Sequence, residues 1–277
     1  MRTFLSAAAV ACLVSAAVSA QDQTIIVEHS QVTAPKIDCS VAAPAAGFTP
    51  NLGAGRDALR GGMPLLAVAH LKPLADTVPE AARLYGGLLL TGNACVPADK
   101  VRAEALLRQA AAAKDIPAMV FLGGVYRQGK TLPQNDAEAL RYYRMAAEAG
   151  DMPAAVNLGL MYRDGRGTAP DGHLYLYWTA KAAAAGRPVG LMNIALAYHN
   201  GTFLPKDDEA AYFWISVAMG RILAADTTNR QHMIRIRSEL AALFSDEDRQ
   251  RIARKASRWQ PGNGALDDVL KAEVHTP

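Results

Sequence analysis

The distribution of small, aromatic and glycine residues repeats along the middle of the chain at an interval of 36 residues. Four sets of positions keep this interval through three copies: Tyr126, Tyr162 and Tyr198; Gly129, Gly165 and Gly201; Tyr142, Trp178 and Trp214; and Ala146, Ala182 and Ala218. A weaker copy lies upstream, at Ala81, Gly86, Leu89 and Gly92. A fixed period of this length is typical of a repeat architecture, in which every unit contains the same pair of elements.

Within one copy the pattern predicts two helices joined by a loop. In the best-defined copy, residues 154–162 are apolar or small, and Gly165 follows as a helix end. Pro170 and Asp171 lie in the loop, and residues 175–185 form the second helix. One such pair leaves an apolar face uncovered, so neighbouring pairs must stack. The sequence therefore predicts an all-α fold, an α-solenoid of helix-turn-helix repeats.

The composition agrees with closely packed helices. Hydrophobic residues make up 51% of the chain, but only 6% of residues are aromatic, because 54 residues are alanine. An all-β sandwich would use more Val, Ile, Thr and aromatic residues. Charged residues are only 20% of the chain and the net charge is +3, which disfavours a disordered protein. Alanine favours helices and allows them to approach one another.

Targeting and helix-boundary signals divide the chain into segments. The first residues have one positive charge, a short apolar run and Val18-Ser19-Ala20, which predicts a signal peptide cleaved after Ala20 and a periplasmic or secreted protein. Thr77, with Glu80 three residues later, predicts a capping box at the start of the array. The predicted segments are a signal peptide (1–20), an irregular N-terminal arm (21–76), a degenerate first repeat (77–115), three further repeats (116–151, 152–187 and 188–224), a C-terminal capping helix pair (225–260) and a loose tail (261–277).

Two cysteines, Cys39 and Cys95, remain after removal of the signal peptide. In an oxidising compartment we expect them to form a disulfide that ties the N-terminal arm to the folded body, and two buried free thiols are the alternative. No later apolar run reaches 18 residues, so no membrane span is expected after cleavage.

The segment 157–167, followed by an aromatic pair, Ala182-Ala183 and Gly186, is similar to a Sel-1-like repeat, a relative of the tetratricopeptide repeat. The resemblance covers roughly residues 80–221. Copy four departs from the pattern at Ala195 and at Gly201-Thr202-Phe203, and copy one has Leu106-Leu107 in place of the aromatic pair. The resemblance implies a right-handed superhelix whose first helices line a concave groove, and a role in protein-protein interaction.

Sequence motifs for catalysis are missing. The chain has no His-Glu-x-x-His, Gly-x-Ser-x-Gly, Walker or Ser-x-x-Lys motif, and its six histidines lack the spacing of metal ligands. Gly53 to Ala58 matches a dinucleotide fingerprint only formally, because no βαβ unit surrounds it. We therefore expect no catalytic residues, no metal and no cofactor.

Polar residues that follow the same period are the candidate binding residues. Arg127, Arg163 and His199 come directly after the repeated tyrosines, and Asn157 and Asn193 precede them on the same helices. By resemblance to tetratricopeptide arrays these positions lie near the groove, where they would donate to a carboxylate or a peptide backbone. A solvated helix face is the alternative. The aromatic column of Tyr142, Trp178 and Trp214 is interpreted as core.

These features favour a non-enzymatic periplasmic scaffold that binds another protein or peptide in its groove. The resemblance implies a role in envelope assembly or in regulating a membrane sensor. A cell-wall-acting hydrolase with an unrecognised site is the alternative, and a third hypothesis places binding in the N-terminal arm. Residues 221–258 hold nine Arg or Lys and five Asp or Glu, but without interleaved aromatics they do not indicate nucleic-acid binding. Contact with an acidic partner stays open.

Overall fold

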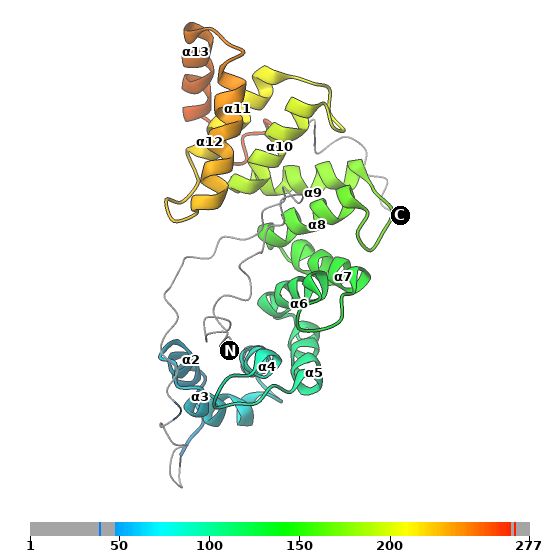
Figure 1. Cartoon of the computed structure of the whole chain (residues 1–277), viewed down its shortest axis with the longest axis vertical. Coiled ribbons are helices and arrows are strands. Elements are labelled where there is room, and N and C mark those ends of the chain that lie inside the picture. Colours follow the sequence, from blue (N-terminus) through cyan, green and yellow to red (C-terminus); the bar gives the residue numbers. More distant parts are fainter. Residues whose placement is uncertain (1–38, 40–47, 267–268, 270–277) are drawn as a thin grey trace, which may run out of the picture. The chain divides into compact units, whose positions relative to one another are not determined.

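The computed structural model describes residue 39, residues 48–266 and residue 269, and every regular element in these ranges is a helix (Figure 1). The predicted signal peptide and its cleavage point lie outside the described residues, as does most of the predicted arm before residue 48. The described chain therefore has the predicted all-α secondary structure.

Contacts divide the chain into two compact units, with the division between Ala146 and Ala147. The first contains α2 (Leu52–Arg60), α3 (Pro64–Leu71), the 3-10 helix η1 (Lys72–Leu74), α4 (Pro79–Thr91), α5 (Lys100–Ala112) and α6 (Ile116–Gln128), and α7 (Asp136–Glu148) runs across the division. The second contains α8 (Met152–Asp164), α9 (Gly172–Ala184), α10 (Pro188–Asn200), α11 (Asp208–Met219), α12 (Thr227–Ala241) and α13 (Asp246–Ser257). Within each unit, successive repeat helices pack against one another, α4 to α6 in the first and α8 to α11 in the second.

The helix ends explain why the repeat has its period. Gly165 ends α8 in the left-handed conformation with a φ of 66°, which glycine adopts without strain, and Gly129 and Gly201 end α6 and α10 in the same way. The loop then closes with a backbone bond from the Asp171 N–H to the Tyr162 carbonyl at 2.8 Å. The Asp171 side chain accepts from the Leu174 N–H and caps α9. Asp99, Asn135 and Asp207 cap the other second helices at the same interval.

The core of each unit consists of the repeated columns. Tyr142, Trp178 and Trp214 are buried, which confirms the interpretation of the aromatic column as core. The alanines at 146, 182 and 218 are fully buried, as expected where helices approach closely. At Gly159 a Cβ atom would lie 2.9 Å from Thr179 Oγ1 and 3.1 Å from the Tyr175 carbonyl, so α8 and α9 touch at their backbones.

The prediction of an irregular chain through residue 76 is wrong for residues 52–74, which form α2, α3 and η1. Asn51 caps α2 by accepting from the Ala54 N–H, and Pro64 begins α3. These helices are short, 9 and 8 residues, so their periodicity is weak and tertiary contacts decide their structure. One such contact is the buried His70, whose Nδ1 accepts from the Asn51 N–H at 3.1 Å.

The predicted capping box at the start of the array is also wrong. The N-cap of α4 is Val78, which has no side-chain cap bond. The Thr77 hydroxyl instead donates to the Leu74 carbonyl at 3.4 Å, because η1 places that carbonyl within its reach. The first helix of the array therefore begins from a packed 3-10 turn rather than from a side-chain cap.

The predicted C-terminal helix pair is present as α12 and α13, both packed on α11. Ser245 caps α13 by accepting from the Asp248 N–H, as predicted. Beyond the pair, Trp259 packs on Trp214 with ring centroids 5.7 Å apart. The prediction of a loose tail from residue 261 is wrong for its described part, because Gly262 donates to the Ala184 carbonyl and Leu266 is buried.

Candidate functional site

The candidate binding residues of the second unit are connected through a tyrosine of α9. The Arg163 guanidinium lies 5.9 Å from the Tyr175 ring centroid, and the Tyr175 hydroxyl donates to the backbone carbonyl of Asn193 at 3.4 Å. Arg163 belongs to α8 and Asn193 to α10, so Tyr175 links the first helices of two successive repeats. The structure thus brings together two residues that the sequence placed in separate repeats.

Sequence reasoning did not single out Tyr175 as a site residue, although the repeat carried the signal. The equivalent positions one repeat earlier and one repeat later are Ala139 and Ala211, so an aromatic residue stands in an alanine column. Its side chain is buried, and burial raises the pKa of Tyr175 to about 12 against the opposing effect of Arg163. The signal was therefore a tyrosine at a position where the neighbouring repeats have alanine, and this tyrosine links Arg163 to Asn193.

Arg163 and His199 occupy equivalent helix ends and each contacts a carboxylate. Arg163 Nε donates to Asp164 Oδ1 at 2.7 Å, and His199 Nδ1 lies 2.7 Å from Asp208 Oδ1. Lys206 Nζ is 3.6 Å from the other oxygen of Asp208. The Arg163 and His199 side chains are 32% and 30% exposed, so both can be reached from solvent.

Asn157 and Asn193 lie deeper in the second unit, at 2% and 5% exposure. Within the described part of the chain, neither side-chain amide nitrogen has a hydrogen-bond partner, and the Asn157 amide oxygen has none. A buried donor without an acceptor costs about 1–3 kcal/mol. These side chains face the packing between helices rather than solvent, and their predicted role in partner contact stays a prediction.

Arg127 belongs to the first unit and is half-buried in the last turn of α6. The tyrosine before it, Tyr126, is part of an ionic network of that unit. Its hydroxyl donates to Glu104 Oε1 at 2.6 Å and accepts from Arg108 at 2.8 Å, and the Arg108 guanidinium also pairs with Glu138 at 3.2 Å. Burial raises the pKa of Tyr126, and Arg141 and Arg108 lower the pKa of the Glu138 carboxyl. This network joins α5, α6 and α7 and is structural.

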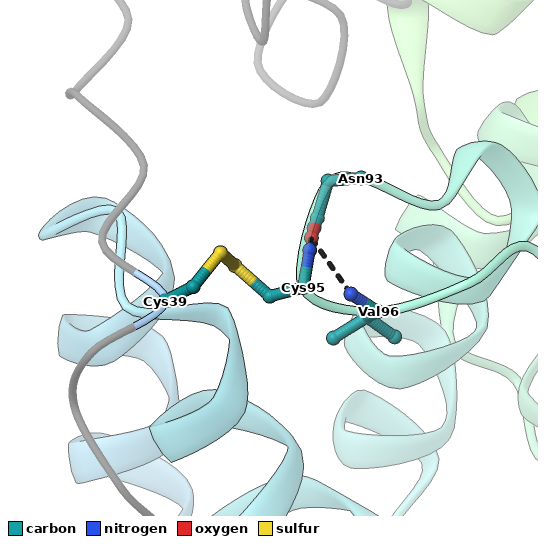
Figure 2. The surroundings of a disulfide bond; sticks show 4 residues. All are labelled: Cys39, Asn93, Cys95 and Val96. Atoms are coloured by element: carbon teal, nitrogen blue, oxygen red, sulfur yellow. Dashed lines mark hydrogen bonds between the residues drawn. A yellow bond between two sulfur atoms is a disulfide. The ribbon is translucent and has the colours of Figure 1, made fainter.

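Cys39 lies against Cys95, which belongs to the loop between α4 and α5. The two Cα atoms are 5.4 Å apart and the two sulfur atoms are in contact (Figure 2). The side chain of Asn93 holds that loop, because its Oδ1 accepts from the N–H groups of Cys95 and Val96 at 2.9 and 3.0 Å. The geometry permits a disulfide across 56 residues of sequence.

Among the described residues, no group of three or more His, Cys, Asp or Glu side chains is arranged to hold a metal ion. Within the same residues, no helix combines the length and apolar character needed to cross a bilayer.

Tyr175→Phe is expected to reduce the loss of stability at alkaline pH. The pKa of Tyr175 is about 12 in the folded protein against an ordinary value of 10.0. Because the folded value is higher, the contribution of the neutral phenol is fully present below the unfolded pKa and is lost as the pH rises toward the folded pKa. Urea unfolding across this window should therefore show a shallower pH slope for the variant.

The matched control for this measurement is Tyr177→Phe, on the same helix but partly exposed. It should leave the slope close to that of the parent protein. Equal slopes for the parent and for Tyr175→Phe would contradict the raised pKa.

Comparison with known proteins agrees with this architecture. A family model described as Sel1 repeat matches residues 79–115, 116–151, 153–186 and 188–218. Solved structures with similar folds include a protective antigen of uropathogenic Escherichia coli strains displaying an SLR fold (19% identity, TM-score 0.59, covering 77% of this chain) and a Sel1 repeat protein from Oxalobacter formigenes (24% identity, TM-score 0.56, covering 74% of this chain). This chain covers 45% of the antigen and 84% of the Oxalobacter protein.

No curated protein sequence matches the chain. The similar structures confirm the predicted α-solenoid class, and the match to the family model confirms the resemblance on which the repeat interpretation depended. Sel1 repeats generally form interaction scaffolds that bind other proteins. The four matched repeats place this chain in the Sel1 repeat family.

Proposed function

We propose that the protein is a non-enzymatic scaffold of the periplasm that binds another protein through a groove lined by the first helices of its repeats. In the second unit the contact residues are Arg163 and His199, on the helices that also carry the buried Asn157 and Asn193, and in the first unit Arg127 has the equivalent position. The partner acts in envelope assembly or is a membrane sensor that the scaffold restrains.

The observation that carries the proposal is the pair of partly exposed nitrogen groups at equivalent helix ends, the Arg163 guanidinium and the His199 imidazole, each in contact with a carboxylate of its own chain. A surface ion pair contributes only about 0–1 kcal/mol, so a carboxylate from a partner can replace Asp164 or Asp208 at low cost. A carboxylate of the partner is the ligand that these donors would recognise.

The test is in-cell crosslinking of the full chain, with identification of the captured proteins. Arg127→Glu and Arg163→Glu reverse the charge at the two helix ends and should strongly reduce capture of the groove partner, because a partner carboxylate is then repelled. Arg60→Glu is the matched control, since Arg60 is 77% exposed on α2 and outside the repeats. Unchanged capture and unchanged envelope phenotype in both groove variants would overturn the proposal.

Two alternatives give different results in the same experiment. If the N-terminal arm is the binding part, deletion of residues 21–38 abolishes capture while the groove variants keep it. If the protein is a cell-wall hydrolase, the purified chain turns over muropeptides and a single carboxylate substitution stops the reaction.

The compartment and the disulfide form one linked part of the proposal. Residues 1–20 direct the chain to the periplasm, and the oxidising environment there joins Cys39 to Cys95. The contact between the two cysteines supports the pairing. A bridge of this kind would restrict the unfolded chain and stabilise the protein by about 2–4 kcal/mol.

Thiol labelling of the protein isolated from the periplasm tests this pairing. Neither Cys39 nor Cys95 should react in denaturant alone, and both should react after addition of a reductant. Cys95→Ala should free Cys39 for labelling and serves as the internal control. Quantitative labelling of both thiols without reductant would show that the pair is reduced.

A further inference from the structure

We propose that the end of the α12–α13 hairpin is a second docking surface, separate from the repeat groove, that binds an acidic segment of a partner protein. The surface, called here the C-terminal patch, consists of Leu223, Arg230, Ile234, Arg254 and Arg258. It lies beyond residue 218, where the match to the family repeats ends.

The topology of the hairpin places these residues at one end. Only residues 242–245 connect α12 to α13, so the two helices run antiparallel, and both pack on α11 (Figure 1). Arg221, which precedes α12, donates to the carbonyl of Trp259, which follows α13, so the start of α12 and the end of α13 lie at the same end of α11. Leu223 directly precedes α12 at the same end, and Ile234 follows Arg230 by one helical turn.

The structure separates seven of the nine basic residues between 221 and 258 into two groups. Four arginines are engaged: Arg221 donates to the Trp259 carbonyl, Arg237 to Ser216, Arg249 to Asp246 and the Ala241 carbonyl, and Arg251 to Glu209 and Asp248. The guanidinium groups of Arg230, Arg254 and Arg258 form no ion pair or hydrogen bond with any residue that the structure describes.

Two of the carboxylates close to these three arginines in sequence already have partners. Asp226 accepts from the Asn229 N–H and side chain at the start of α12, and Asp248 accepts from Arg251 and from the Ser245 hydroxyl. A positive charge in the last turn of α13 is favoured by the helix dipole, which accounts for one such residue there. It does not account for Arg230, which lies in the first turn of α12, where the dipole opposes a positive charge.

Two large apolar side chains accompany the arginines. Leu223 is 62% exposed and Ile234 is 45% exposed, although the outer face of a capping helix is normally polar. Arginine next to exposed aliphatic side chains is the composition of a protein interface, in which charged groups surround an apolar contact. The complementary partner is a segment that carries Asp or Glu on both sides of a bulky apolar residue.

The same observations disfavour a membrane surface as the occupant. A helix that binds in the membrane interface turns a continuous apolar face outward. The continuous apolar face of α12, formed by Met233, Ile236 and Leu240, is buried. A single outward isoleucine among arginines suits a protein partner better than a lipid layer.

The experiment measures binding of a short fluorescein-labelled peptide, in which pairs of glutamates flank leucine, to the full chain by fluorescence anisotropy. The double variant Arg254→Gln with Arg258→Gln should weaken binding about tenfold, because two charge-assisted contacts are lost. The double variant Leu223→Ser with Ile234→Ser should weaken it several-fold without changing its salt dependence. The glutamine counterpart of the peptide should not bind.

The matched control is Arg60→Gln with Arg102→Gln, two exposed arginines of the first unit, and it should leave the affinity unchanged. Equal losses of affinity in the Arg254/Arg258 variant and in this control would overturn the proposal, because binding would then follow net charge alone. Arginine-dependent binding to phosphatidylglycerol vesicles without binding of the peptide would also overturn it and assign a lipid ligand. Arg163→Glu should not affect the peptide, so failure of the groove proposal and failure of this one are distinguishable.

Discussion

Trp214→Ala is expected to lower the free energy of unfolding of the second unit by about 3–5 kcal/mol, the range for removal of a buried tryptophan. Trp214 is buried in α11, and its ring contacts Phe213 at 4.8 Å and Trp259 at 5.7 Å between centroids. Trp259 in turn holds Arg221 above its ring at 4.8 Å. Alanine at this position leaves a cavity and also removes the ring on which the C-terminal segment packs. The expected loss of stability includes both effects.

Urea unfolding followed by circular dichroism measures the change, and hydrogen exchange locates it. Amide protons of α12 and α13 should exchange faster in the variant than those of α8, because both helices pack on α11. Leu243→Ala is the control, since Leu243 is exposed after the end of α12, and it should change stability by no more than about 0.5 kcal/mol. A loss below 1 kcal/mol for Trp214→Ala would show that the cap packs independently of this ring.

Gly159→Ala is expected to destabilise the protein by about 1–3 kcal/mol, although alanine normally favours a helix. The added methyl group would lie 2.9 Å from Thr179 Oγ1 and 3.1 Å from the Tyr175 carbonyl, which is backbone and cannot rotate away. The helices α8 and α9 would have to separate, and the contact of Tyr175 with Arg163 and Asn193 would shift with them. We therefore expect Gly159→Ala to lower the stability of the protein and also to weaken binding of the groove partner.

The matched control is Gly87→Ala in α4, where an added Cβ atom has no atom within 4 Å. That variant should be stabilised by about 0.5–1 kcal/mol through helix propensity alone. Thermal unfolding of both variants gives the comparison directly. If Gly159→Ala were as stable as Gly87→Ala, the close approach of α8 to α9 would not be required by the fold.

The sequence predicted the repeat well because a stacked array uses the same contact many times. Gly129, Gly165 and Gly201 end equivalent helices with φ values between 65° and 66°, so the backbone requirement is visible as a glycine column. The capping column at Asp99, Asn135, Asp171 and Asp207 has the same origin, although it was not identified from the sequence. Local chemistry that recurs at a fixed interval can be detected without a structure.

The site was predicted less completely because its contacts cross between repeats. The position of Arg163 was visible in the sequence, but its contact with Tyr175 depends on the packing of α9 against α8. The burial of Asn157 and Asn193 likewise follows from neighbouring helices that the period alone does not place. Helices α2 and α3 were missed for a related reason, since they lie outside the repeats and gain their stability from contacts such as that of Asn51 with His70.

The sequence by itself determined that this protein is a stack of helix pairs of 36 residues with a capped C-terminal end, because glycine ends, alanine contacts and aromatic core positions are local requirements that recur in each copy. Only the tertiary structure decided which charged side chains are engaged and which remain available. Arg251 and Arg254 are three residues apart on one helix, yet Arg251 binds Glu209 from α11 and Arg254 pairs with no described residue. An ion pair depends on distances between segments far apart in the chain, and sequence spacing does not contain those distances.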